Sequence, residues 1–447
     1  MSASERDVGL VRVLGTWGLA ASVISIIVGA GIFAVPGKLA ASIGVYAPLA
    51  FLGCTLAVSA VGICFAEGGS RIPTSGGVYG YIEVSLGPLV GYVAGTLKWF
   101  GSLMSGASVA AALADVAASI TPAHWVGWVR AAVIVSSIGG VALINVRGVR
   151  SGARLIGVAT ALKLVPLVIF IVVGATAVHR ANFAVPVNPV TAAPGRALIL
   201  ALFALIGMET ALCASGEVAD PARTIPRALA LGLGTVAVLY VSIQVVAQGV
   251  LGPALAASSV PLADAMARFG AGLRTLMLLG AAVSMLGCIG SDILGSPRMM
   301  FAIARDGLLP RVLARVHPRT HVPHVAILTY AVVQIAFALS GTFAELAVLA
   351  TLTVAGLYIT GCFAAWRLAR RGVALAGAPL NFRWLGTAAA VAIGSMLLII
   401  ALASREEITG LIALIAISAA AYLLQTRFRP VAPAGGRSSS GSRRSAP

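Results

Sequence analysis

Four ionisable side chains lie inside long apolar runs of this sequence, and these residues are the best placed to do chemistry. They are Lys98, Lys163, Glu209 and Asp292. A charged side chain at the centre of a bilayer costs roughly 3 kcal/mol to insert, so such residues face the bundle interior or a water-filled cavity. We therefore weigh a functional and a structural role for each of them.

The two lysines differ in depth. Lys163 lies deep within the apolar run 154–175, too far from either end to snorkel easily. In a functional role it would tether a broken helix through free carbonyls, where a sodium ion would otherwise bind, and exchange a proton. In a structural role it would be a fixed internal cation. Lys98 stands beside Trp99, and we interpret it as snorkelling or pairing.

The two carboxylates also allow two roles. Glu209 would sense protons or bind a polar substrate in a functional role, and would cap freed backbone N–H groups in a structural one. Asp292 would face the cavity and favour a cationic or amine group in a functional role. Its structural alternative is a pairing with a neighbouring Ser or Lys.

Glycine interrupts two of the apolar runs at mid-depth. Gly29 and Gly31 stand in the run 14–35, and Gly207 stands in the run 197–216. Glycine costs a helix about 1 kcal/mol relative to alanine and lets the backbone leave the helical conformation. The amides and carbonyls freed in a membrane survive only against protein, a cavity or a ligand. We predict that the two breaks form two walls of one small-molecule site.

Composition places the chain in a membrane. The 447 residues are 59% hydrophobic and 10% charged, with a mean hydropathy of +1.00. The apolar residues come in blocks of about 20, the length that crosses roughly 30 Å of hydrocarbon. The net charge of +17 does not indicate nucleic-acid binding, because the basic residues are distributed among short loops, as expected of loops retained in the cytoplasm.

No set of residues typical of an enzyme or a metal site occurs in the sequence. The five cysteines lie within or at the edges of apolar segments, and no C-x-x-C is present. The five histidines lie in loops or at span ends without metal-ligand spacing. A catalytic triad and a phosphate-binding loop are also lacking. We therefore expect neither an enzyme, nor a cofactor or metal, nor ATP-driven transport.

The apolar runs predict an all-α membrane protein with twelve transmembrane helices. We place them at residues 14–35, 46–66, 88–112, 127–146, 154–175, 197–216, 228–250, 272–302, 324–341, 345–366, 384–403 and 408–425. Lys and Arg gather in the N-terminal segment and in every second loop, which predicts cytoplasmic N- and C-termini. We expect residues 66–77 to form a polar, glycine-rich cytoplasmic loop, and residues 253–271 to form a re-entrant or amphipathic lid on the opposite side.

The positions of the two broken spans predict an internal repeat. They are the first and the sixth, and an odd offset gives the two halves opposite orientations. We predict a five-plus-five inverted repeat, residues 14–175 against 196–366, with the site at its interface. Helices 11 and 12, within residues 384–425, lie outside the repeat. Residues 1–13 form a cytoplasmic segment and residues 430–447 a disordered tail.

Five motifs occur in a characteristic order and spacing. They are Gly29-Ala30-Gly31-Ile32-Phe33, Pro73-Thr74-Ser75-Gly76-Gly77-Val78-Tyr79, Gly207-Met208-Glu209, the run from Ser215 to Arg227, and the run from Ser296 to Pro310. In this order the chain resembles the amino acid–polyamine–organocation (APC) permeases, over roughly residues 10–425. The resemblance implies the inverted five-plus-five fold with twelve spans.

The resemblance also implies substrate-binding roles for both breaks. The substrate carboxylate is expected on the backbone amides of Gly29, Ala30, Gly31 and Ile32. The α-ammonium is expected on the carbonyls of Phe203, Ala204, Leu205 and Ile206. Phe203 matches the position of an occluding gate, whereas the residues alone allow equally a packed core aromatic.

Three of the ionisable residues match positions of interest in such permeases. Lys163 matches a lysine that stands near a sodium position, which favours sodium-independent transport. Glu209 matches a carboxylate implicated in proton response in some members. Asp292 falls where members vary among Trp, Asn and others, a departure that would mark substrate preference.

The predicted function is secondary active transport of amino acids across the cell membrane by alternating access. The energy would come from protons or from exchange, and the protein would be a monomer or a homodimer. One alternative is a polyamine or cationic amino acid antiporter, which Asp292 and Glu209 would suit. A second is a nutrient sensor that binds without moving its ligand, against which the short tail argues.

Overall fold

A computed structural model of the chain describes residues 15–72, 77–147, 163–184, 194–212, 218, 220–305, 309–320, 322–375 and 379–428, and throughout these ranges the regular structure is helical. The α-helices are α1 (Thr16–Ile27), α2 (Gly31–Ile43), α3 (Ala47–Arg71), α4 (Val78–Leu86), α5 (Pro88–Ala118), α6 (Val126–Arg147), α8 (Pro194–Leu205), α9 (Met208–Ala211), α10 (Pro221–Leu251), α11 (Pro261–Ala267), α12 (Ala271–Arg305), α13 (His324–Ser340), α14 (Phe343–Arg370), α15 (Leu385–Ala401) and α16 (Arg405–Phe428). A further helix, Lys163–Ala175, lies between α6 and α8.

Eight helical stretches in the described ranges are long and apolar enough to cross a membrane. They are Gly31–Arg71, Pro88–Ala118, Ala123–Arg147, Pro194–Ala211, Pro221–Ala257, Ala271–Arg305, Phe343–Arg370 and Arg405–Thr426. Shorter apolar helices are Thr16–Ile27, Lys163–Ala175, His324–Ser340 and Leu385–Ala401. The prediction of an all-helical chain with several helices apolar enough to span a membrane is confirmed for the described residues, and the number of twelve spans stays a prediction.

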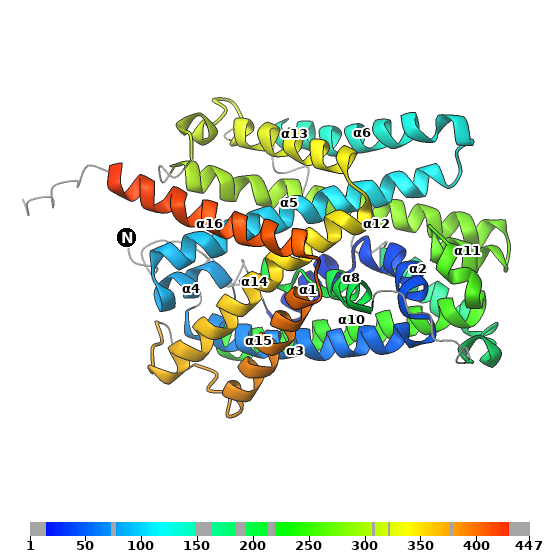
Figure 1. The fold of residues 1–447 in the computed structure, drawn as a ribbon, viewed down its shortest axis with the longest axis horizontal. Coiled ribbons are helices and arrows are strands. Elements are labelled where there is room, and N and C mark those ends of the chain that lie inside the picture. The colour runs from blue at the N-terminus through cyan, green and yellow to red at the C-terminus, as the bar shows by residue number, and fades with distance from the viewer. Residues whose placement is uncertain are drawn as a thin grey trace, which may run out of the picture.

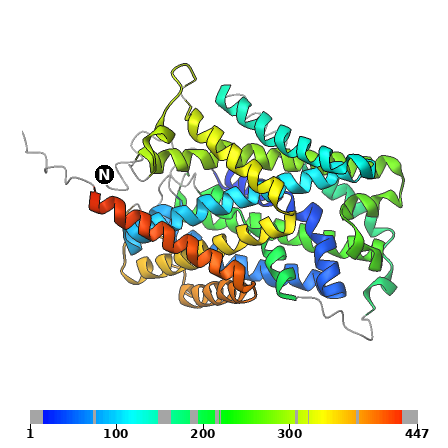
Figure 2. The same ribbon diagram turned by 45° about the horizontal axis from the view of Figure 1, so that its top comes forward.

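The helices run mostly along the long axis of the molecule and enclose α1 and α8 (Figure 1). α2 packs against α8, α1 packs against α10, and α5 packs against α12 and α14. α6 and α13 lie side by side along one edge in both views (Figures 1 and 2). The two breaks predicted from glycine are thus held at the centre of the bundle, surrounded by helices that present apolar surface to the membrane.

The prediction of a loop over residues 66–77 is wrong in its first half. α3 continues through Arg71, and every residue from Ala66 to Arg71 is buried. The reason is an i,i+4 ion pair, because Arg71 Nε donates to Glu67 Oε1 at 2.8 Å inside this last turn. The predicted end of the second span therefore came too early, and residues 73–76 lie outside the described ranges.

The same turn of α3 holds a distant part of the chain. The Phe382 amide donates to Glu67 Oε2 at 2.9 Å, the Leu375 amide donates to the Arg71 carbonyl at 2.8 Å, and Arg71 Nη2 donates to Asn381 Oδ1 at 2.5 Å. We call this set of contacts the α3 clamp. It fastens the connection between α14 and α15 to the end of α3.

Several predictions fall wholly or partly outside the described ranges. They concern the N-terminal segment 1–13, the tail 430–447, residues 154–162 of the fifth span and most of the run 213–219. In the segment 253–271 the structure has a 3-10 helix, Gly252–Ala257, followed by α11. These two short helices lie at the end of the bundle opposite the C-terminal end of α16 (Figure 1).

Candidate functional site

The first predicted break is present between α1 and α2. α1 ends at Ile27, and the helix resumes at Gly31. A helix end leaves its last four carbonyls without intrahelical donors, and three of these four have found partners. The Val28 amide donates to the Ile24 carbonyl at 2.9 Å, and the hydroxyl of Tyr240 donates to the Ile27 carbonyl at 2.9 Å. The third partner is the Lys163 ammonium, which donates to the Ser25 carbonyl.

The amide side of the first break is less satisfied. The Phe33 amide donates to the Ala30 carbonyl at 3.1 Å. The amides of Gly31 and Ile32 have no acceptor among the described residues. Both residues are buried at the N-terminus of α2, where the helix dipole favours a negative charge.

The second predicted break lies between α8 and α9. α8 ends at Leu205, and Gly207 adopts a φ of +128°, a conformation that residues with a Cβ rarely adopt. The Gly207 amide donates to Glu209 Oε2 at 3.1 Å, so a side chain of the next helix caps the break. The Ile206 amide donates to the Leu202 carbonyl at 3.1 Å.

The carbonyl side of the second break remains open. The carbonyls of Phe203, Ala204 and Leu205 have no hydrogen-bond donor within the part of the chain that the structure describes. All three residues are almost fully buried. Buried backbone groups in proteins are nearly always paired. These three carbonyls are therefore able to accept hydrogen bonds from a ligand.

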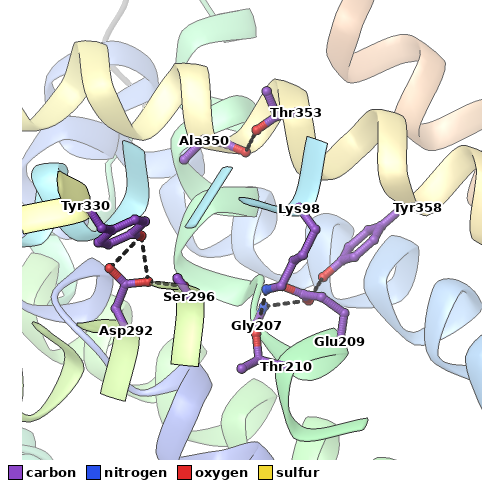
Figure 3. A network of polar contacts seen from close by, with 10 residues as sticks. All are labelled: Lys98, Gly207, Glu209, Thr210, Asp292, Ser296, Tyr330, Ala350, Thr353 and Tyr358. Atoms are coloured by element: carbon purple, nitrogen blue, oxygen red, sulfur yellow. Dashed lines mark hydrogen bonds and ion pairs between the residues drawn. The ribbon is translucent and has the colours of Figure 1, made fainter. Parts of the chain in front are cut away.

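Glu209 is the centre of a buried polar network that four other residues join (Figure 3). Lys98 Nζ lies 2.9 Å from Glu209 Oε1 and donates to Thr210 Oγ1 at 2.6 Å. The hydroxyl of Tyr358 donates to Glu209 Oε2 at 2.7 Å. The Glu209 side chain is 3% exposed and that of Lys98 is 17% exposed. Lys98 therefore pairs, as interpreted from the sequence, and neutralises the carboxylate that caps the second break.

The two breaks touch each other. A Cβ on Gly31 would lie 2.7 Å from Ala204 Cα, and a Cβ on Gly207 would lie 2.9 Å from Ile26 Cγ2. Both distances are below any normal contact, so glycine is needed for this approach. The structure thus brings residues about 175 positions apart in the sequence against one another, as two adjoining walls.

Phe203 is packed rather than exposed. Its ring meets that of Phe343, the first residue of α14, edge to face at a centroid distance of 5.7 Å, a favourable aromatic geometry. The Phe203 residue is 5% exposed. This packing is the one expected of a core aromatic residue, and the role of Phe203 as a gate stays a prediction.

Asp292 lies in a separate cluster (Figure 3). The hydroxyl of Tyr330 donates to Asp292 Oδ2 at 2.9 Å, Gln334 Nε2 donates to the same oxygen at 2.7 Å, and Ser296 Oγ donates to Oδ1 at 2.7 Å. The pairing with a serine, which was the structural alternative for Asp292, is present. Its described hydrogen-bond partners all belong to α12 and α13, so none belongs to the broken segments.

Comparison with known proteins assigns the family. A family model described as "Amino acid permease" matches residues 14–424. The chain belongs to the amino acid permease family. It is 36% identical over 317 residues to an uncharacterized transporter of Mycobacterium tuberculosis, covering 70% of each chain. It is 28% identical over 346 residues to the methylthioribose transporter of Bacillus subtilis, covering 72% of this chain and 74% of the relative.

A third relative of this permease is the branched-chain amino acid permease BcaP of Bacillus subtilis. The identity is 28% over 351 residues, covering 73% of this chain and 74% of the relative. The family and its members are transporters and not enzymes. The described residues also contain no group of three or more His, Cys, Asp or Glu placed to hold a metal ion.

Sequence reasoning missed two hydroxyls at the breaks of this permease. Tyr240 and Tyr358 are both fully buried, one on the first break and one on Glu209. A signal was available, because the hydroxyl of a tyrosine inside an apolar run needs a partner once it is buried. The sequence could not say which partner, since each contact joins helices far apart in the chain.

Proposed function

We propose that this permease is a secondary active transporter that carries an α-amino acid across the cell membrane by alternating access. The supporting observation is a complementarity between the two breaks. At the first break, Lys163 and Tyr240 donate hydrogen bonds to carbonyls of α1. The amides of Gly31 and Ile32 there have no acceptor among the described residues. At the second, the Gly207 amide is taken by Glu209, and carbonyls are left.

The groups left over match a zwitterion. Free amides at the N-terminus of α2 suit a carboxylate, and the free carbonyls of Phe203, Ala204 and Leu205 suit an α-ammonium. Because Gly31 already touches Ala204, a bound substrate would have to part the walls and would then bridge them. Movement of Phe203 away from Phe343 would admit it. This motion is the local step that alternating access requires.

Lys163 and Glu209 are the proposed coupling residues. Lys163 occupies the carbonyl end of the first break, where a cation is favoured, and this supports transport without sodium. Glu209 joins the second break to Lys98 and Tyr358. A proton gradient or exchange against another solute is the proposed energy source.

The architecture we propose has twelve spans with cytoplasmic termini. Each of the two segments 14–175 and 196–366 begins with a broken helix, and the order of the helices that follow, as far as they are described, agrees with an inverted repeat. α15 and α16 would be helices 11 and 12. The oligomeric state we propose is a monomer or a homodimer.

The alternative functions differ in whether Asp292 must bind a substrate cation. A polyamine or cationic amino acid antiporter would need that carboxylate to bind a second cation. Its oxygens already accept from Tyr330, Gln334 and Ser296, which favours a neutral amino acid. One relative is named as a methylthioribose transporter. Methylthioribose is not a zwitterion, and it is therefore included among the compounds to be tested. A sensor would bind its ligand and not move it.

The test is a ligand screen followed by transport. The purified protein would be heated with each amino acid, with polyamines and with methylthioribose, and compounds that raise its melting temperature would be assayed for uptake into proteoliposomes. A ligand at 100 times its Kd stabilises by about 2.7 kcal/mol. We expect an amino acid to stabilise and be transported, and its methyl ester and N-acetyl derivative to do neither. Stabilisation by polyamines or methylthioribose alone would contradict the proposal, and binding without uptake would indicate a sensor.

A further inference from the structure

A groove opens on the outer surface of the bundle between α5, α6 and α12. It encloses about 460 Å³, which lies within the range of roughly 300–1,000 Å³ that ligand sites occupy. Its lining includes Ile120, Leu279 and Leu286, whose side chains are 67%, 60% and 42% exposed. The groove therefore faces the membrane and not the centre of the bundle, and it contains no residue of the two broken helices.

The wall of this groove is hydrocarbon. Apart from Ser136 and Ser137, all the lining residues are Ala, Val, Leu or Ile. The Ser136 hydroxyl donates to the Val133 carbonyl at 3.3 Å, and the Ser137 hydroxyl donates to the Ile134 carbonyl at 3.2 Å. Both hydroxyls are thus satisfied within α6. A wall of this kind suits an acyl chain and offers little to a polar ligand.

Two arginines lie beyond one end of the groove. Arg130 precedes the lining residue Val133 by three positions on α6, and Arg274 precedes the lining residue Leu278 by four positions on α12. Residues at these spacings share one face of a helix, and helical side chains tilt toward the N-terminus. α6 and α12 both begin at the end of the bundle where α11 lies (Figure 1). Both guanidinium groups therefore point out of the same end of the groove.

Each arginine keeps donors for a further anion. Arg130 Nη1 is paired with Asp115, and Arg274 Nε lies 3.9 Å from Asp264 Oδ1. The arginine side chains are 29% and 32% exposed. A guanidinium has five N–H donors in a planar fork, and each of these ion pairs engages one nitrogen. The remaining donors suit the oxygens of a phosphate group.

Two tryptophans mark the level of the membrane surface at this end. Trp125 and Trp128 stand at the start of α6 and are 55% and 75% exposed. Tryptophan is enriched where the bilayer meets water. Arg130 follows Trp128 by two positions, so its guanidinium lies at the level of lipid headgroups. The groove extends from there into the hydrocarbon.

We propose that this groove binds one anionic glycerophospholipid. Arg130 and Arg274 bind its phosphate-bearing headgroup, and the aliphatic lining holds one acyl chain. In the proposed topology the lipid belongs to the outer leaflet. It joins α5, α6 and α12 at one end of the bundle and so stabilises the folded protein. The site is separate from both breaks, and the inference does not depend on the proposed function.

The first experiment measures lipid binding to the purified, delipidated protein by native mass spectrometry. The protein is titrated with phosphatidylglycerol and with phosphatidylcholine of the same acyl chains, and we expect one phosphatidylglycerol to bind more tightly than any phosphatidylcholine. Arg130→Gln and Arg274→Gln should each weaken it about tenfold, the effect of one lost hydrogen bond to a charged group. The control is Arg268→Gln, an exposed arginine after α11 that does not line the groove, and its affinity should equal that of the parent.

The second experiment fills the groove and leaves its charges in place. Ala282→Phe adds a ring to the lining on α12, and Ala132→Phe adds the same ring at an exposed position of α6 outside the groove. In the parent, phosphatidylglycerol should raise the melting temperature more than phosphatidylcholine does. We expect Ala282→Phe to lose this difference together with the tightly bound lipid, and Ala132→Phe to keep both. The arginine variants leave the groove lining unchanged, so they decide the proposal even where Ala282→Phe does not fold.

Three outcomes would overturn the proposal. Equal affinity of the parent for the two lipids would show that the arginines do not read the headgroup. Tight binding retained in both arginine variants, or in folded Ala282→Phe, would place the lipid elsewhere. A parent dimer that Ala282→Phe converts to a monomer would show that a second copy of the chain covers the groove. Neither experiment measures uptake, so these outcomes leave the proposed function untouched.

Discussion

The two breaks differ in which end of the helix the protein itself has satisfied. At the first, a lysine and a tyrosine hydroxyl donate to the carbonyls that end α1. At the second, a carboxylate accepts from the Gly207 amide. Each break thus keeps one polarity free, and the free polarities are opposite. Under the proposed function, this difference would leave backbone amides for the carboxylate of a zwitterion at one break and backbone carbonyls for its ammonium at the other.

The largest effect is expected where the two breaks meet. Gly31→Val places side-chain atoms against Ala204, whose Cα would lie only 2.7 Å from the new Cβ, so the walls are forced apart and the free amides and carbonyls no longer face one ligand. We expect uptake to be abolished while the protein is still made and inserted. The control is Gly139→Ala on α6, where a Cβ would meet nothing within 4 Å. Normal uptake by Gly31→Val would show that the contact between the walls is not needed.

The next largest effect is expected at the second break, where a double-mutant cycle tests whether Lys98 and Glu209 are coupled. Glu209→Gln leaves the Lys98 ammonium without its partner, and an unpaired buried charge costs roughly 3–5 kcal/mol. Lys98→Met leaves the opposite charge unpaired. We expect either single variant to have a lower melting temperature than the double variant Lys98→Met/Glu209→Gln. Additive losses in the double variant would mean that the two side chains are not coupled.

The sequence predicted both breaks because glycine within an apolar run is a local signal. It also predicted that Lys163 would bind carbonyls of the first broken helix. For Asp292 the sequence favoured a role facing the cavity, and the structure has the contact of the structural alternative, a bond from Ser296 at i+4. The sequence indicated no partner for Glu209. Lys98 and Tyr358 are 111 and 149 positions away, and only tertiary packing brings them together.

The predicted loop over residues 66–77 failed for a different reason. Its glycines and polar residues are typical of a connection, and Glu67 and Arg71 were not seen as a pair within a helix. The ring of Tyr81 packs against Gly68, where a Cβ would lie only 2.9 Å from it, so this close approach requires glycine inside the helix. The glycines of this turn thus serve close packing, and the Glu67–Arg71 ion pair holds the turn helical.

A smaller effect is expected from the partners of the first break. Lys163→Ala leaves the Ser25 carbonyl without its donor, and a lost hydrogen bond to a charged group amounts to about 1.5–3 kcal/mol, or at least tenfold in uptake. Tyr240→Phe removes a neutral hydrogen bond of about 1 kcal/mol, so uptake should fall roughly fivefold. Both would be measured in proteoliposomes with equal amounts of protein. Unchanged uptake by Lys163→Ala would remove its role as a tether.

The smallest effect is an expected absence of change. Because the Lys163 ammonium donates to a carbonyl of the first break, we expect replacement of sodium by choline to leave the initial rate of uptake unchanged. The measurement uses the same proteoliposomes with a fixed pH gradient. A steep dependence on sodium would show that the two breaks are joined by a bound metal ion as well as by the substrate.

The α3 clamp gives this molecule an internal frame of reference. Because amides of the connection between α14 and α15 are bonded to the last turn of α3, we expect these segments to keep their separation if other helices shift. Spin labels placed on the end of α3 and on that connection should therefore report one constant, narrow distance during turnover. Distances from the same frame to α1 and α8 would then measure the motion of the broken helices directly.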